Sequence, residues 1–178
     1  MSDLILRNRQ HTRPVNLPVL RRIARVLLEE LLGLEQYDLG VRLVGSVEMI
    51  RVNRRFLNHP GSTDVITFDH LVPSARNPRP ATRIEGEMFI CLDDAVAQAR
   101  KFRTAWQSEL VRYLAHGVLH LRGYDDLEPA ARRAMKREEN RLLRSLAKRF
   151  RFDQLARPRG ARAGDAAAFS RASPDSRS

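Results

Sequence analysis

The sequence predicts an α+β fold, in which a small mixed β-sheet of about four strands packs against about five helices. Two patterns lead to this prediction. Apolar residues alternate in several short segments, which is typical of strands, and recur every third or fourth residue in longer segments, which is typical of helices. The length of 178 residues and the hydrophobic content of 43% suit one domain with a sizeable core.

Four segments have the composition and length of strands. They cover residues 4–9, 37–45, 65–68 and 83–92. Leu39, Val41 and Leu43 show the period of two most clearly. We expect the 65–68 strand to be central in the sheet, with the 83–92 strand pairing beside it.

Two helices are predicted in the first third of the chain. Asn16 can cap the first one, Pro18 suits its first turn, and Gly33 can end it. Its apolar stripe has the helical spacing and consists of Leu20, Ile23, Leu27 and Leu31. Ser46 is expected to cap a short second helix that runs to about Leu57.

Two more helices follow the last strand. Asp93 is expected to cap a helix that ends near Phe102. Thr104 and Gln107 then fit a capping box at the start of a helix over 105–121. These two helices would connect the sheet to the histidine-containing segment of the chain.

The final predicted helix opens at Pro129 and runs to about Phe150. Its inward residues are Met135, Leu142, Leu146 and Phe150. Its other faces carry the basic residues Arg132, Arg133, Lys136, Arg137, Arg141 and Arg144. These charges indicate either a solvated face or a surface that binds phosphates, and the sequence leaves both open.

The composition changes in two segments. Residues 71–82 contain three prolines among Ser, Arg and Asn, which predicts a loop. Residues 153–178 are rich in Arg, Ala, Ser and Gly and cannot bury enough apolar surface to fold, so we expect a disordered basic tail. The predicted organisation is therefore a single domain over 1–152 followed by this tail.

The most informative segment contains two histidines, His116 and His120, that are four residues apart. This spacing puts both imidazoles on one face of the 105–121 helix, at the edge of its apolar side. Gly123 can end the helix in a left-handed conformation, and the chain can then turn back to bring Asp126 to the same point. Three protein ligands with a fourth position open are typical of a catalytic zinc site, so we expect one zinc ion, or another divalent metal, per chain.

The overall charge favours a polyanionic partner. The net charge is +11 and the isoelectric point is near 11.1. Nucleic acid is the leading interpretation, although a general compositional bias towards Arg and Ala is an alternative. The sequence has no apolar run of membrane-spanning length and no recognisable signal peptide, and its single cysteine, Cys91, suits a reducing cytoplasm.

The histidine segment resembles the signature of the YbeY endoribonucleases, which are bacterial rRNA maturation factors. Further similar segments are Thr63-Asp64-Val65-Ile66-Thr67-Phe68, Gly86-Glu87-Met88-Phe89-Ile90, the pair Gln98-Ala99, and Glu109. The resemblance extends over about residues 38–146 in the same order. It implies an α+β fold, endoribonuclease activity, and action on the small ribosomal subunit at the 3′ end of its 16S rRNA.

The sequence departs from the family pattern in two places. Asp126 stands where the family commonly has a third metal-binding histidine, and Leu57 stands where it commonly has an arginine that is thought important for activity. His59 is a candidate to transfer a proton instead, because imidazole titrates near neutral pH, although it could be an ordinary loop residue. Asp125 could orient a ligand or accept a proton, or it could only stabilise the turn.

These observations predict a metal-dependent, single-strand-specific endoribonuclease in rRNA maturation and ribosome quality control. Its site would contain His116, His120 and Asp126 as metal ligands, with His59 and Asp125 as catalytic candidates. An alternative is an RNA-binding ribosome-assembly factor with a structural metal. A zinc metalloprotease is less favoured, because the glutamate that such enzymes need after the first histidine is replaced by Gly117.

Overall fold

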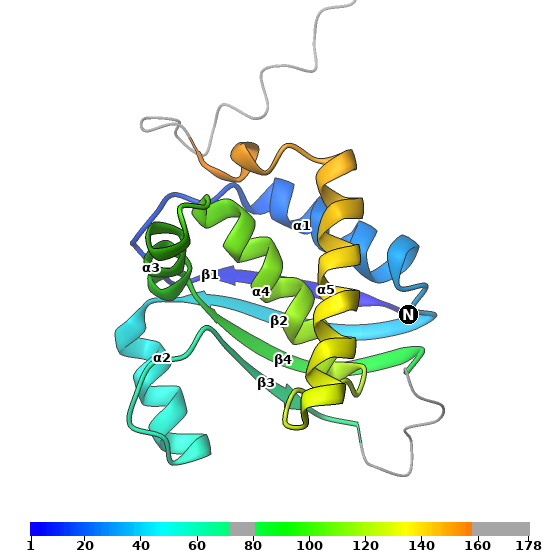
Figure 1. The fold of residues 1–178 in the computed structure, drawn as a ribbon, viewed down its shortest axis with the longest axis horizontal. Helices are drawn as coiled ribbons and strands as arrows, with labels where there is room; N and C mark the ends of the chain where they lie inside the picture. The colour runs from blue at the N-terminus through cyan, green and yellow to red at the C-terminus, as the bar shows by residue number, and fades with distance from the viewer. Residues whose placement is uncertain (72–80, 158–178) are drawn as a thin grey trace, which may run out of the picture.

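A four-stranded mixed sheet organises the chain, and most of the helices lie on one of its faces (Figure 1). The computed structural model describes residues 1–71 and 81–157. Its strands are β1 (Asp3–Asn8), β2 (Gln36–Val44), β3 (Val65–Asp69) and β4 (Arg83–Cys91). Its α-helices are α1 (Leu17–Arg25), α2 (Ser46–Val52), α3 (Leu92–Phe102), α4 (Trp106–Leu121) and α5 (Pro129–Arg149). The predicted α+β class is therefore confirmed.

The strand order is β1-β2-β4-β3. Strands β1, β2 and β4 run parallel, and β3 pairs antiparallel to β4. The prediction that 65–68 pairs beside 83–92 is thus confirmed, but the prediction that it is central is wrong, since β3 is an edge strand. Its apolar residues serve two faces: Val65 packs against the main core, whereas Ile66 belongs to a separate cluster on the other face.

The two faces of the sheet bury very different amounts of apolar surface. Alternate residues of a strand point to opposite faces, and Leu39, Val41 and Met88 contribute to a large core together with α1, α4 and α5. We call this side the inner face. The outer face has a small cluster, formed by Val44, Met49, Val52, Ile66 and Cys91, with Phe68 and Phe89 packed against it.

Two helices continue as wider π-helical turns. Helix α1 is capped by Asn16, whose side chain accepts a hydrogen bond from the backbone N–H of Val19, and it continues as η1 (Val26–Leu31) before Gly33 adopts a positive φ of 57°. Helix α2 continues as η2 (Asn53–Leu57). The predicted helices at these positions exist, but their last turns are not α-helical.

Three predicted helix caps are wrong. Ser46 is the first residue of α2, and its backbone N–H donates to Asp93 Oδ2 at 2.6 Å. Asp93 lies inside the first turn of α3, and its carboxylate caps α2 instead of its own helix. Thr104 donates its hydroxyl hydrogen to Glu109 Oε1 at 2.8 Å, and no side chain caps α4, so the capping box with Gln107 does not form.

The folded part extends beyond the predicted boundary at residue 152. The short 3-10 helix η4 (Phe152–Leu155) ends at the fully buried Leu155, whose carbonyl accepts a hydrogen bond from the N–H of Asn16. The start of the tail at 153 is thus corrected, and residues 158–178 of that predicted tail lie outside the described residues. So does most of the predicted 71–82 loop. Within residues 1–71 and 81–157, no helix has both the length and the apolar character needed to span a membrane.

Candidate metal centre

Helix α4 presents both histidines from the edge of the inner core. The intervening Gly117 faces the sheet, where an added Cβ would lie 3.1 Å from Val65 and 3.2 Å from Met88. Because this side of the helix is packed tightly, the two imidazoles project from its flank. The prediction that the site lies at the edge of the core agrees with this arrangement.

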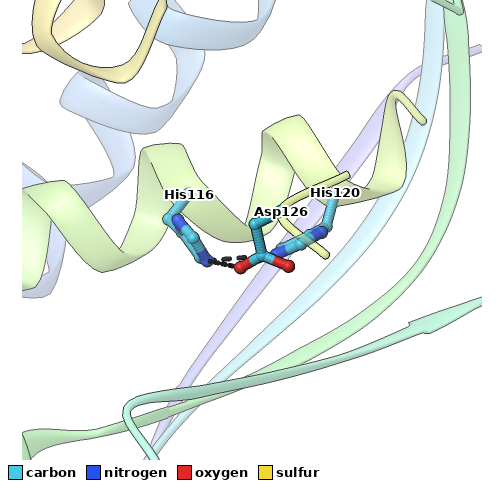
Figure 2. A group of neighbouring side chains, drawn as sticks. All are labelled: His116, His120 and Asp126. Atoms are coloured by element: carbon cyan, nitrogen blue, oxygen red, sulfur yellow. Dashed lines mark hydrogen bonds and ion pairs between the residues drawn. The ribbon is translucent and has the colours of Figure 1, made fainter. Parts of the chain in front are cut away.

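The turn after α4 brings Asp126 back to the histidines, as Figure 2 shows. Gly123 has a φ of +95°, a conformation that glycine adopts without strain, and its N–H donates to the carbonyl of His120 at 2.9 Å. Arg132 of α5 donates a hydrogen bond to the backbone carbonyl of Asp126 at 3.0 Å and fastens the far end of the turn.

The three side chains form a compact triangle. The Nε2 atoms of His116 and His120 are 3.0 Å apart, and Asp126 Oδ2 lies 3.9 Å and 3.7 Å from them. In a tetrahedral zinc site with metal–ligand distances of about 2.1 Å, neighbouring ligand atoms are about 3.4 Å apart. The three separations lie on both sides of that value, so the triangle has the right size for one ion.

The other ring nitrogens of both histidines are already engaged. His116 Nδ1 is 3.0 Å from Glu139 Oε2, and His120 Nδ1 is 3.2 Å from the backbone carbonyl of Tyr124. Both partners are acceptors, so they favour the proton on Nδ1 and leave the Nε2 lone pairs directed towards Asp126. A metal-binding histidine typically has this second contact, and the residues therefore fit a metal.

Glu139 is a buried carboxylate with three cationic or proton-donating partners. It is 3% exposed, and besides His116 it accepts hydrogen bonds from Arg112 Nη1 at 2.6 Å and Lys136 Nζ at 2.8 Å. Burial alone would raise the pKa of Glu139, but the hydrogen bonds from His116, Lys136 and Arg112 outweigh it and lower the pKa to about 2. The carboxylate is therefore charged at any physiological pH.

The two histidines have opposite pKa shifts. Burial lowers the pKa of His116, but the hydrogen bond and charge of Glu139 outweigh this effect, so the pKa is raised overall. Burial, together with the charge of His116, lowers the pKa of His120. Because the pKa of His116 is raised, a metal would compete with a proton for the Nε2 atom of His116 more than for that of His120.

The sequence reasoning missed Glu139, although a signal for it exists. Glu139 lies between Met135 and Leu142 on the buried side of α5. An acidic residue in an apolar stripe needs a partner, and a histidine pair elsewhere in the chain offers one.

The six basic residues that the sequence predicts on the outward faces of α5 are exposed: Arg132, Arg133, Lys136, Arg137, Arg141 and Arg144.

A cavity of about 260 Å³ opens beside the triangle. Its lining includes His116 and Asp126, and also Asp64, which lies just before β3 and which the sequence reasoning did not assign to the site. The two catalytic candidates do not line this cavity. His59 is an exposed residue after η2, and Asp125 is exposed and accepts a hydrogen bond from the N–H of Leu127 at 2.8 Å.

The arrangement accounts for Asp125 as a residue that stabilises the turn, and its catalytic role, like that of His59, stays a prediction. Leu57, at the position where the family commonly has an arginine, is 49% exposed at the end of η2. The neighbouring Arg54 and Arg55 are exposed as well.

Comparison with known proteins identifies the family. Residues 5–147 match the sequence profile described as Endoribonuclease YbeY. The chain belongs to the YbeY family. The resemblance seen in the sequence is thereby confirmed, and the match extends to the N-terminal strand β1 and through most of α5.

Individual relatives agree. The chain is 35% identical over 127 residues to Endoribonuclease YbeY of Chlorobium phaeovibrioides, covering 71% of this chain and 80% of that protein. It is 39% identical over 128 residues to the YbeY of Chlorobaculum parvum, covering 67% and 84%. The solution structure of TM1509 from Thermotoga maritima has the same fold, with a TM-score of 0.59 at 21% identity over 90% of this chain and all of that one.

Proposed function

We propose that the chain is a metal-dependent endoribonuclease that cleaves single-stranded RNA. The observation that carries this proposal is the triangle of His116, His120 and Asp126, supported by Glu139 and opening onto a cavity. When bound, zinc or another divalent ion supplies a nucleophile at neutral pH and neutralises phosphoryl charge. Membership of the YbeY family favours RNA as the substrate.

The residues of the chain hold the site and attract the substrate. Glu139 fixes the ring of His116, and Arg132 fixes the turn that carries Asp126. Arg112, Arg132 and Lys136 line the cavity, where they can contact phosphate oxygens on either side of the cleaved bond. His59 and Asp125 remain candidates for proton transfer, to be tested by substitution.

The cellular substrate that we propose is the rRNA of the small ribosomal subunit, at the 3′ end of its 16S rRNA, in maturation and quality control. The net charge of +11 and the family support this choice. Ribosomal or ribosome-associated proteins would be partners, and the location would be the cytoplasm. A precursor subunit with an unprocessed 3′ end is the substrate with which to test these statements.

The second candidate is an RNA-binding assembly factor whose metal is structural. The observation that favours it is Leu57, an exposed apolar residue where the family commonly has an arginine. Metalloprotease activity is disfavoured, because Gly117 faces Val65 and Met88 and its position has no room for the catalytic glutamate of such enzymes.

The deciding experiment compares metal-stripped and metal-restored protein on a labelled single-stranded RNA, its duplex and the DNA of the same sequence. We expect cleavage of the single-stranded RNA alone, restored by zinc or manganese, and strong loss of bound metal in the double variant His116→Ala, His120→Ala. RNA binding without cleavage under every metal condition would favour the assembly factor. Full metal occupancy in the double variant would refute the proposed site.

A further inference from the structure

A groove continues from the metal centre along the start of β3. Asp64 lines three neighbouring cavities: the one of about 260 Å³ that contains His116, one of about 360 Å³ and one of about 490 Å³. The second reaches Phe102 at the end of α3, and the third reaches Lys101 beside it. The shared residue makes these three cavities one path that leads away from the metal ligands.

The charges along this groove are distributed unevenly. At the metal end, the three basic residues Arg112, Arg132 and Lys136 line the first cavity together with three carboxylates, those of Asp64, Asp126 and Glu139, and a bound divalent ion would make this end positive overall. At the outer end, the third cavity has two carboxylates, Asp64 and Asp94, against one ammonium group. Phosphates therefore fit the metal end, whereas the outer end suits a neutral group that donates hydrogen bonds.

An exposed aromatic ring stands at this outer end. Phe102 is 62% exposed, and the ammonium group of Lys101 lies 5.3 Å from the centre of its ring. Any of the four nucleobases can stack on such a ring.

The wall between the cavities contains an unpaired polar group. Tyr113 lines the first two cavities and is 4% exposed, and its hydroxyl has no hydrogen-bond partner among the described residues. Buried polar atoms in folded proteins are nearly always paired. A polar ligand in the groove provides a partner for this hydroxyl that the rest of the described fold does not.

Asp64 is held in a fixed orientation at the junction of the three cavities. Its Oδ1 accepts hydrogen bonds from the N–H of Val65 at 2.9 Å and from the hydroxyl of Thr63 at 3.1 Å. A carboxylate in this position has the chemistry to accept a hydrogen bond from a sugar hydroxyl. Among nucleic acids, only RNA has a 2′-hydroxyl.

We infer that the groove binds one nucleotide of single-stranded RNA beside the cleaved bond: Phe102 stacks on its base and Asp64 accepts a hydrogen bond from its 2′-hydroxyl. This inference rests on the proposed function, and it adds a base-stacking position and a basis for choosing RNA over DNA. The phosphate of the same nucleotide lies towards Arg112 and Lys136.

The test measures fluorescence polarisation of a labelled single-stranded RNA and of the DNA of the same sequence with the zinc-loaded, full-length protein, and follows RNA cleavage in parallel. Phe102→Ala should weaken RNA binding by about fivefold to 100-fold, and Phe102→Trp should restore it. Asp64→Ala should weaken RNA binding about threefold to tenfold and leave DNA binding unchanged. A general loss of structure would instead weaken both.

The matched control is Phe56→Ala, which removes a ring that is 57% exposed and lines none of the three cavities. It should leave the affinity unchanged. If RNA is cleaved but Phe102→Ala and Asp64→Ala bind as the unmodified protein does, the nucleotide site is refuted and the proposed function stands. If no RNA is cleaved but binding depends on both residues, the nucleotide site stands and the nuclease function fails.

Discussion

The inner and outer faces of the sheet carry different kinds of residue. The inner face packs against α1, α4 and α5 in a core that includes the segments around both histidines and Glu139. The outer face is covered at one end by α2 and η2, over a cluster of only five buried residues. Three of the exposed large apolar side chains, Val47, Phe56 and Leu57, lie on this smaller unit.

This difference explains why the metal ligands lie on the side of the inner face. Metal ligands must be positioned to a fraction of an ångström. Both histidines lie on α4, which has nine buried residues, and Asp126 lies in the turn that follows this helix. The exposed His59 and the exposed arginines of η2 project from the smaller outer unit and contribute no ligand to the triangle. The comparison predicts that damage to the inner core reaches the metal centre, whereas damage to the outer cluster does not.

Truncation of one buried residue on each face is the strongest test of this comparison. Leu114 and Met49 are both fully buried, in the inner core and the outer cluster respectively. Leu114→Ala should lower the free energy of unfolding by about 2–5 kcal/mol and weaken zinc binding, because Leu114 precedes His116 by half a helical turn. Met49→Ala should cost about 2 kcal/mol, since half-buried neighbours can close the cavity. Zinc affinity unchanged in both variants would contradict the comparison.

Two glycines of the sheet give the next largest contrast. A Cβ on Gly86 would lie 2.3 Å from the backbone oxygen of Phe68, whereas a Cβ on Gly40 would make an ordinary contact at 3.5 Å with Glu87. Gly86→Ala should therefore cost about 3 kcal/mol, because strand β3 must move. Gly40→Ala should be neutral or slightly stabilising, and urea unfolding of both variants measures the difference.

The sequence predicts what depends on local pattern and on short spacing. The four strands and five helices were found from periodicity, and the metal triangle from a spacing that one helix and its turn determine by themselves. Asn16 and Gly33 were assigned correctly for the same reason, since a cap or a helix end involves only neighbouring residues.

What was missed depends on contacts between distant segments. Asp93 caps α2, which begins 47 positions earlier in the chain. Strand β3 resembled a central strand because it is apolar on two faces. It is nevertheless an edge strand, and both of its faces are apolar because α4 packs on one side of it and α2 on the other. Glu139 and Asp64 reach the metal centre from α5 and from the start of β3, and nothing in the spacing along the chain brings them there.

Substitution of Glu139 tests whether contacts on the inner face hold the metal-binding histidines in position. Glu139→Gln keeps the volume of the side chain but removes the charge that holds the Nδ1 proton of His116. Loss of such a supporting contact typically weakens metal affinity tenfold to 100-fold, which corresponds to about 1.4–2.7 kcal/mol. Competition with a chromophoric chelator measures this effect.

Glu138→Gln is the matched control. It removes the same charge from the adjacent position, where Glu138 is paired with Arg141 at 2.6 Å, away from the histidines. Zinc affinity should be unchanged in this variant. An equal loss in both variants would mean that the zinc affinity depends on the negative charge of α5 in general and not on the contact between Glu139 and His116.

The smallest expected effect concerns the attachment of the outer unit. Asp93 accepts a hydrogen bond from the N–H of Ser46 at the start of α2, and another from the hydroxyl of Thr12. The hydrogen bond from Thr12, followed by that from Ser46, lowers the pKa of Asp93 below its ordinary value, against the opposing effect of burial. Asp93→Asn should cost about 1 kcal/mol at neutral pH and leave zinc affinity unchanged, because α2 and not α4 is released.

The pH dependence of this cost has a definite sign. A carboxyl group whose pKa is lower in the folded protein than in the unfolded chain stabilises the fold above the unfolded pKa of about 4, and this stabilisation is lost as the pH falls through the folded value. The difference between Asp93→Asn and the unmodified protein should therefore disappear in acid. The neighbouring Asp94 is a control of opposite sign, since burial raises its pKa. Asp94→Asn should be neutral or stabilising at pH 7. Urea unfolding between pH 7 and pH 3 measures the free energy of unfolding of both variants and of the unmodified protein. If these free energies depend on pH in the same way in all three proteins, neither carboxylate acts through its charge.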